Sequence, residues 1–127
     1  MTTQKQIALT GFMLGALAVS LGAFGAHALK SSLALHNRTE TYELAVRYHF
    51  YHALALVALA GLRQHLSEKV ARWSARLFVL GTLCFSGSLY LLAVFEISAV
   101  VFVTPLGGIL LIAGWLTAAW GVAKSTN

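Results

Sequence analysis

The sequence is short of charge, of cysteine and of proline, and each shortage narrows the class of protein. Only 10% of its 127 residues are charged, against roughly 25% in soluble domains. The one cysteine, Cys84, lies inside an apolar run, so no intrachain disulfide can form. The one proline, Pro105, marks the only proline break in the helical pattern. With 58% hydrophobic residues and a mean hydropathy of +0.76, the chain is suited to lipid rather than to water.

Long apolar runs take up most of the chain, over residues 7–29, 44–62, 77–95 and 99–123. About 20 residues of helix span a hydrocarbon core of about 30 Å, and lipid tolerates no unpaired backbone groups. The sequence therefore predicts an all-α protein with four transmembrane helices in a tightly packed bundle. Their expected bounds are about 7–29, 40–63, 71–95 and 98–123, within one domain over residues 1–127.

Positive charge indicates how such a protein would lie in the membrane. The connection 63–76 carries Arg63, Lys69, Arg72 and Arg76 against the single carboxylate of Glu68. By the positive-inside rule this connection is cytoplasmic, and an even number of crossings places both termini on the same side. The formal charge of +5 is thus an orientation signal. No basic soluble face with stacking groups is visible, so no nucleic-acid partner is predicted.

Small residues recur at helical spacing and predict where the helices meet. Close backbone approach at such residues is how membrane helices gain packing without a hydrophobic drive. We expect intramolecular packing at these seams and a left-handed bundle, with a homo-oligomer face as the alternative. The seams are Gly11, Gly15, Ala18, Gly22 and Gly25 in the first run, Ser74, Gly81 and Ser88 in the third, and Gly107, Gly114 and Gly121 in the fourth.

The stretch TPLGG at 104–108 interrupts the fourth run. Pro105 has no N–H to donate to the carbonyl of Val101, and Gly107 and Gly108 follow directly. We favour a kink in a continuous helix. The alternatives are a helix that restarts at Pro105 with Thr104 as its cap, and an irregular backbone that lines a cavity.

Polar side chains gather toward the non-cytoplasmic half of the predicted bundle. Glu43 and Arg47 are spaced to form an i, i+4 pair, and His52 lies about 12 Å along the helix from Leu44. We expect His27 to face the bundle at the same level and to share a network with His52. Ionisable residues at such depth are candidate functional groups. The candidate ligand-binding residues are His27, Glu43, Arg47, Tyr48, His49, His52, Tyr90 and Thr104.

Several hypotheses fit this polar layer. The histidines can serve as satisfied structural groups that join two helices, or as part of a small-ligand, lipid-headgroup or proton site. A haem or metal at His27 and His52 is the less favoured alternative, because no carboxylate or cysteine completes a ligand set. We predict no metal or cofactor.

No catalytic set is visible, since the bundle holds no deep pair of carboxylates and no convincing Ser-His-acid arrangement. We therefore expect a non-enzymatic binding or assembly module. Its partners would be the bilayer, a lipid or small-molecule ligand, and further copies of the chain. The alternative functions are a haem-, metal- or quinone-binding redox subunit, and conduction of a small ligand or protons by an oligomer.

Four stretches carry a family resemblance: LGAFGAHAL at 21–29, YHFYHALAL at 48–56, FSGSLY at 85–90 and TPLGG at 104–108. They resemble the signature of the YgdD-like (YwdK-like) family of small bacterial inner-membrane proteins, which has a mitochondrial relative in animals. The resemblance implies a four-helix protein of the bacterial inner membrane, and it implies no activity and no known binding residues. The family-like positions are His27, His52, Ser86, Gly87, Ser88, Tyr90, Thr104, Pro105, Gly107 and Gly108, whereas some members have glutamine at the place of His49.

Overall fold

The computed structural model describes residues 1–126, and over this range every regular element is helical. The predicted all-α fold is therefore confirmed for these residues. The elements are α1 (Thr3–Ala26), α2 (Lys30–Leu35), α3 (Thr39–Gly61), the 3-10 helix η1 (Arg63–His65), α4 (Glu68–Phe95), the 3-10 helix η2 (Ser98–Phe102) and α5 (Thr104–Ala123).

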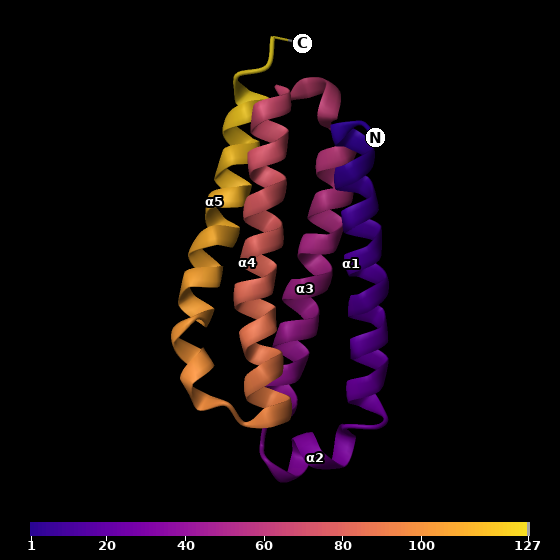
Figure 1. Cartoon of the computed structure of the whole chain (residues 1–127), viewed down its shortest axis with the longest axis vertical. Coiled ribbons are helices and arrows are strands. Elements are labelled where there is room, and N and C mark those ends of the chain that lie inside the picture. Colours follow the sequence, from indigo (N-terminus) through magenta and orange to yellow (C-terminus); the bar gives the residue numbers. More distant parts are fainter. Residues whose placement is uncertain (127) are drawn as a thin grey trace.

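The long helices lie side by side in the order α5, α4, α3, α1 (Figure 1). α1 packs mainly on α3, α5 packs mainly on α4, and the two pairs meet where α3 packs on α4. Contact between α1 and α4 is slight. The four long helices therefore form two tight pairs that are joined through α3 and α4.

Both ends of the described chain and η1 lie at one end of the row, while α2 and η2 lie at the other (Figure 1). Within residues 1–126, three helical stretches are long and apolar enough to cross a membrane: Thr3–Ala26, Glu68–Phe95 and Ser98–Ala123. α3 is not among them, since Arg47 and two histidines lower its hydropathy.

Capping residues explain where the observed helices depart from the predicted bounds. α1 begins at Thr3 because the Thr2 hydroxyl accepts the Lys5 N–H at 3.2 Å, and α4 begins at Glu68 because Ser67 caps it in the same way. α1 ends at Ala26, three residues before the predicted end. The segment between the first two predicted helices contains the short helix α2.

The predicted kink at Pro105 is wrong, because the fourth apolar run is two separate helices. The 3-10 helix η2 ends at Phe102 and α5 begins at Thr104, with Pro105 in its first turn. A proline there removes an N–H that would have no intrahelical partner in any case. Thr104 is the first helical residue rather than the cap, since Val103 occupies the cap position without a side-chain hydrogen bond.

Two glycines mark where helix backbones approach most closely. A Cβ at Gly107 would overlap the backbone nitrogen of Phe85, and a Cβ at Gly11 would lie 2.9 Å from the carbonyl oxygen of Ala53. The other glycines of the predicted seams and of the TPLGG stretch differ in how much space surrounds them. A Cβ would clash at Gly25, Gly81, Gly114 and Gly121, would be tight at Gly22, and would make ordinary contacts at Gly15 and Gly108.

Gly107→Ala is expected to destabilise the protein by about 1–3 kcal/mol, because the added methyl meets backbone rather than a flexible side chain. Unfolding in detergent by titration with SDS measures this free energy. Gly108→Ala is the matched control: its Cβ would lie 3.9 Å from the Phe85 ring, so no loss is expected. Equal stability of the two variants would contradict the close approach of α4 and α5.

Candidate functional site

His52 uses both of its ring nitrogens, one within α3 and one to join α3 to α5. Its Nδ1 lies 2.7 Å from the carbonyl oxygen of Tyr48, and the indole N–H of Trp115 donates to its Nε2 at 3.0 Å. A carbonyl only accepts and an indole only donates, so the proton of the neutral ring must be on Nδ1. The side chain is buried and packs against the ring of Phe78. Its hydrogen-bonding capacity is used within the protein.

His49 belongs to a second set of contacts, one turn earlier on α3. Its buried ring lies with Nδ1 2.9 Å from the Tyr90 hydroxyl on α4. Nε2 faces the backbone of Leu14 on α1 but meets no hydrogen-bond geometry within the described residues. The ring of Tyr90 packs edge-on against Tyr42, at 5.4 Å between centroids, and the Tyr42 hydroxyl donates to the carbonyl of Leu21. These contacts hold α1, α3 and α4 together.

The expectation that His27 faces the bundle and shares a network with His52 is wrong. His27 is exposed, because α1 ends at Ala26 and His27 is its C-cap residue. At the level of His52, α1 contributes Gly11, which packs against Ala53. His27 follows 16 residues later, about 24 Å along α1 by the rise per residue. The structure does not bring the two rings together, so they offer no shared haem or metal site.

The remaining members of the predicted layer lie apart from the histidines or make contacts of their own. The hydroxyls of Thr104 and Ser88 are 2.5 Å apart and join α5 to α4. The buried Ser86 hydroxyl donates to the carbonyl of Ala45 at 2.8 Å and joins α4 to α3. Tyr48 is exposed, and its ring packs on Phe85 and stacks on His52 at 6.1 Å between centroids, so it is the one further member in contact with His52. The single polar layer expected from the sequence is thus several separate contacts between helix pairs.

Glu43 and Arg47 do not form the expected ion pair. Both side chains are exposed, and within residues 1–126 neither takes part in an ion pair. They instead line a pocket of about 490 Å³ between α1, α2 and α3. We call this the α2 pocket. Its lining residues are Gly22, Gly25, Ala26, Lys30, Leu33, Thr39, Tyr42, Glu43, Val46 and Arg47.

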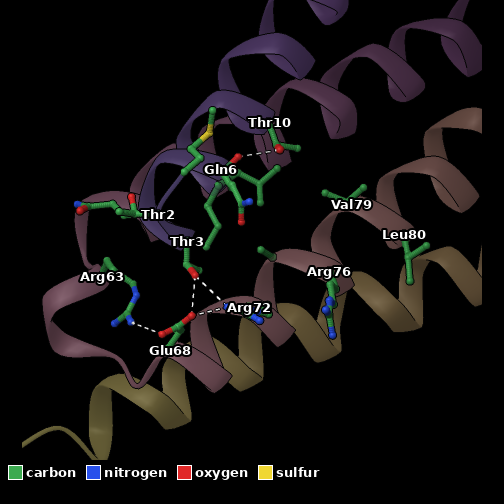
Figure 2. Close-up of a pocket in the computed structure, with 15 residues that line it drawn as sticks. Thr2, Thr3, Gln6, Thr10, Arg63, Glu68, Arg72, Arg76, Val79 and Leu80 are labelled. Atoms are coloured by element: carbon green, nitrogen blue, oxygen red, sulfur yellow. Dashed lines mark hydrogen bonds and ion pairs between the residues drawn. The ribbon is translucent and has the colours of Figure 1, made fainter.

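A groove of about 990 Å³ lies at the opposite end, between the N-terminal halves of α1 and α4, and we call it the α1/α4 groove (Figure 2). A polar bridge crosses its mouth. Thr3 donates to Glu68 at 2.8 Å, and Arg72 donates to both Thr3, at 3.1 Å, and Glu68. Arg63 lies 3.9 Å from the other carboxylate oxygen of Glu68. One carboxylate therefore serves two arginines.

Beyond this bridge the α3 and α4 sides of the groove are mainly apolar, while α1 contributes Gln6 and Thr10 beside Ile7. Arg76 lies one turn past Arg72 on α4 and has no carboxylate partner within the described residues; its guanidinium lies 5.4 Å from the centre of the Trp73 ring. Val79 and Leu80 follow along α4 (Figure 2). The apolar lining is Ile7 of α1, Leu56 of α3, and Ala75, Val79 and Leu80 of α4.

Sequence reasoning missed this groove and the partner of His52. It treated Arg63, Arg72 and Arg76 only as orientation signals, because the sequence does not reveal that α1 and α4 border a common groove. One available signal was the series of apolar residues that follows Arg72 and Arg76 at helical spacing. The other was Trp115, whose indole N–H needs a partner wherever it turns away from lipid.

No group of three or more His, Cys, Asp or Glu side chains that could hold a metal ion is found in residues 1–126.

Double-mutant analysis of His52→Phe and Trp115→Phe is expected to give a coupling free energy of about 0.6 kcal/mol, with about 1.7 kcal/mol as the upper range for hydrogen bonds between membrane helices. SDS titration of the purified variants measures it. His27→Ala is the control, and it should leave stability unchanged and combine additively with His52→Phe. Coupling of His52 to His27 but not to Trp115 would overturn this arrangement.

Comparison with known proteins agrees with the resemblance in the sequence. Residues 21–108 match the model of a family described as a protein of unknown function, DUF423. The chain is 40% identical to the UPF0382 membrane protein YwdK of Bacillus subtilis, over 88% of this chain and 91% of that protein. It is 39% identical to the UPF0382 membrane protein SH2409 of Staphylococcus haemolyticus, over 88% and 90% of the two chains.

A third relative is the UPF0382 inner membrane protein YgdD of Escherichia coli, 38% identical over 85% of this chain and 79% of that protein. No solved structure matches the chain. The extent of these matches shows that the chain belongs to the DUF423 family, whose curated relatives are membrane proteins of the UPF0382 group and whose function is unknown.

Proposed function

We propose that this protein crosses the bacterial inner membrane four times with both termini in the cytoplasm, and that it binds an anionic phospholipid in the α1/α4 groove without catalysing a reaction. The observation that carries the proposal is the groove itself, with arginines at its mouth and apolar side chains of α3 and α4 beyond them. An anionic phospholipid has the same arrangement, with a charged headgroup followed by apolar acyl chains.

Four crossings require that α3 spans the membrane together with its neighbours. α3 has 23 residues, about 34 Å of helix, which is enough to cross a hydrocarbon core of about 30 Å. It lies between α1 and α4, both of which are apolar enough to span. Its histidines make their hydrogen bonds to groups inside the protein, which lowers the free-energy cost of holding them at that depth.

The charge distribution supports the proposed orientation. η1 and the start of α4 lie at the same end as both ends of the described chain (Figure 1). These segments carry Arg63, Lys69, Arg72 and Arg76. Under the positive-inside rule, this end faces the cytoplasm. The inner-membrane location is supported by the printed name of the Escherichia coli relative.

A substituted-cysteine experiment tests this orientation. In a Cys84→Ala background, Ser98→Cys in η2 should react with a membrane-impermeant maleimide added to spheroplasts, whereas Thr126→Cys should react only after lysis. Gel shift or mass spectrometry of the labelled protein measures the reaction. The reverse pattern would place the termini outside and remove the groove from the cytoplasmic leaflet.

Charge at the mouth of the groove favours an anionic ligand. Three arginines line the groove, and Glu68 is the one carboxylate among its lining residues. Glu68 already contacts Arg63 and Arg72, so Arg76 is left without a carboxylate. Guanidinium groups bind phosphate oxygens with paired N–H donors, and basic pockets on the cytoplasmic side of membrane proteins bind anionic headgroups.

The length of the apolar part fits one leaflet. Leu80 follows Arg72 by eight residues, about 12 Å along α4, and half of the hydrocarbon core is about 15 Å. An acyl chain that follows Ile7, Val79 and Leu80 would therefore reach most of the way to the middle of the bilayer. Pockets for small ligands commonly have volumes of about 300–1,000 Å³, and the groove is at the upper end of that range.

Binding without catalysis agrees with the side chains present. The groove-lining residues include no histidine and no second carboxylate that could act as an acid-base pair with Glu68. The redox alternative draws on the histidines, but His52 uses both nitrogens for Tyr48 and Trp115, and His27 lies far from it along α1. Binding at the groove is the function that the geometry supports best.

The test is native mass spectrometry of the protein released from nanodiscs that contain phosphatidylglycerol and phosphatidylethanolamine in equal amounts. The double variant Arg72→Gln/Arg76→Gln is expected to retain phosphatidylglycerol about 30-fold less tightly, since each arginine near an anionic lipid contributes about 1 kcal/mol. Lys69→Gln/Lys124→Gln is the matched control, because it removes the same charge at the same end outside the groove. Equal loss in both double variants would contradict a specific site.

A further inference from the structure

The α2 pocket carries three charged side chains that have no charged partner in residues 1–126: Lys30, Glu43 and Arg47. This is unusual for Glu43 and Arg47, whose i, i+4 spacing on α3 allows an ion pair. The same end of the molecule does form one elsewhere, since Arg38 pairs with Glu96 at 3.0 Å. The charges that line the pocket are thus free to meet a ligand.

We propose that the α2 pocket binds the headgroup of an aminophospholipid such as phosphatidylethanolamine, with the phosphate at Lys30 and Arg47 and the primary ammonium at Glu43. Two cations and one carboxylate complement a ligand with one anionic and one cationic group. A carboxylate accepts hydrogen bonds from a primary ammonium, which has three donors, but not from a quaternary ammonium, which has none.

Apolar walls beside these charges favour a lipid over a free headgroup. Gly22 and Gly25 of α1, Leu33 of α2, and Tyr42 and Val46 of α3 line the same pocket of about 490 Å³. The ring of Tyr42 lies directly over Gly25, where a side chain would overlap it, so glycine at this position lets the Tyr42 ring pack against α1. A water-soluble headgroup would leave this apolar surface uncovered.

The site lies at the far end of the molecule from the α1/α4 groove, between the last turn of α1, α2 and the first turns of α3 (Figure 1). It differs from the groove in charge, because Glu43 lines it without being engaged by an arginine, whereas Glu68 is engaged by two. The two sites therefore select different headgroups, and the second does not depend on the first.

The experiment compares two lipids that differ only at the amine. The protein is placed in nanodiscs with equal phosphatidylethanolamine and phosphatidylcholine in a fixed background of phosphatidylglycerol, and native mass spectrometry measures the ratio of retained lipids. The wild type should retain phosphatidylethanolamine about fivefold over phosphatidylcholine, the effect of one exposed charge-assisted hydrogen bond. Glu43→Gln should lose this preference, whereas Glu40→Gln, an exposed neighbour outside the pocket, should keep it.

Lys30→Gln/Arg47→Gln is expected to lower retention of both lipids without changing their ratio, since both carry the same phosphate. Arg72→Gln/Arg76→Gln should leave the ratio unchanged, which separates this site from the groove. A wild-type ratio equal to that of the bulk lipid, or an unchanged ratio in Glu43→Gln, would overturn the proposal. Binding of water-soluble glycerophosphoethanolamine as tightly as the lipid would overturn the assignment to a lipid.

Discussion

Close backbone contact at glycine is the constraint on which the rest of this structure depends. Gly107 lets α5 lie against the backbone of Phe85 on α4, and Gly11 lets α1 lie against Ala53 on α3. Membrane helices have little hydrophobic reason to associate, so contacts of this kind decide which helices pair. Two tight pairs result, and they meet mainly where α3 packs on α4. Hydrogen bonds from Thr3 to Glu68 and from Trp115 to His52 add contacts between the pairs. The α1/α4 groove is the space that this pairing leaves open.

Polar groups follow the same division. In the interior, His52 bonds to Tyr48 and Trp115, and Ser86 bonds to the carbonyl of Ala45. These groups hold helices together and have little capacity left for a ligand. The side chains with spare charge lie at the two ends, where Arg76 lines the groove and Glu43 lines the α2 pocket. The middle of the helices thus supplies the contacts that hold the fold together, and the two proposed lipid sites lie at its ends.

The sequence predicts the helices well and the site poorly, for a physical reason. Hydrophobic runs and glycine spacing are local properties, so the four long helices and the glycines of α5 were found close to their observed places. Whether a single side chain is buried depends on where its helix ends and on how that helix is rotated about its axis. We expected His27 to face the interior of the bundle, but it is the exposed C-cap residue of α1. The break near Pro105 separates η2 from α5 instead of bending one helix. The groove depends on the distance between α1 and α4, and no local sequence pattern predicts that distance.

Photo-cross-linking with a phosphatidylglycerol analogue that carries a diazirine on its acyl chain tests the account most directly. After irradiation in nanodiscs, peptide mass spectrometry locates the attached lipid. The account predicts attachment concentrated at Ile7, Val79 and Leu80 in the groove, and competition by unlabelled phosphatidylglycerol. Attachment spread evenly over the exposed faces of α1 and α5, at residues such as Phe12 and Ile112, and insensitive to competitor would contradict it.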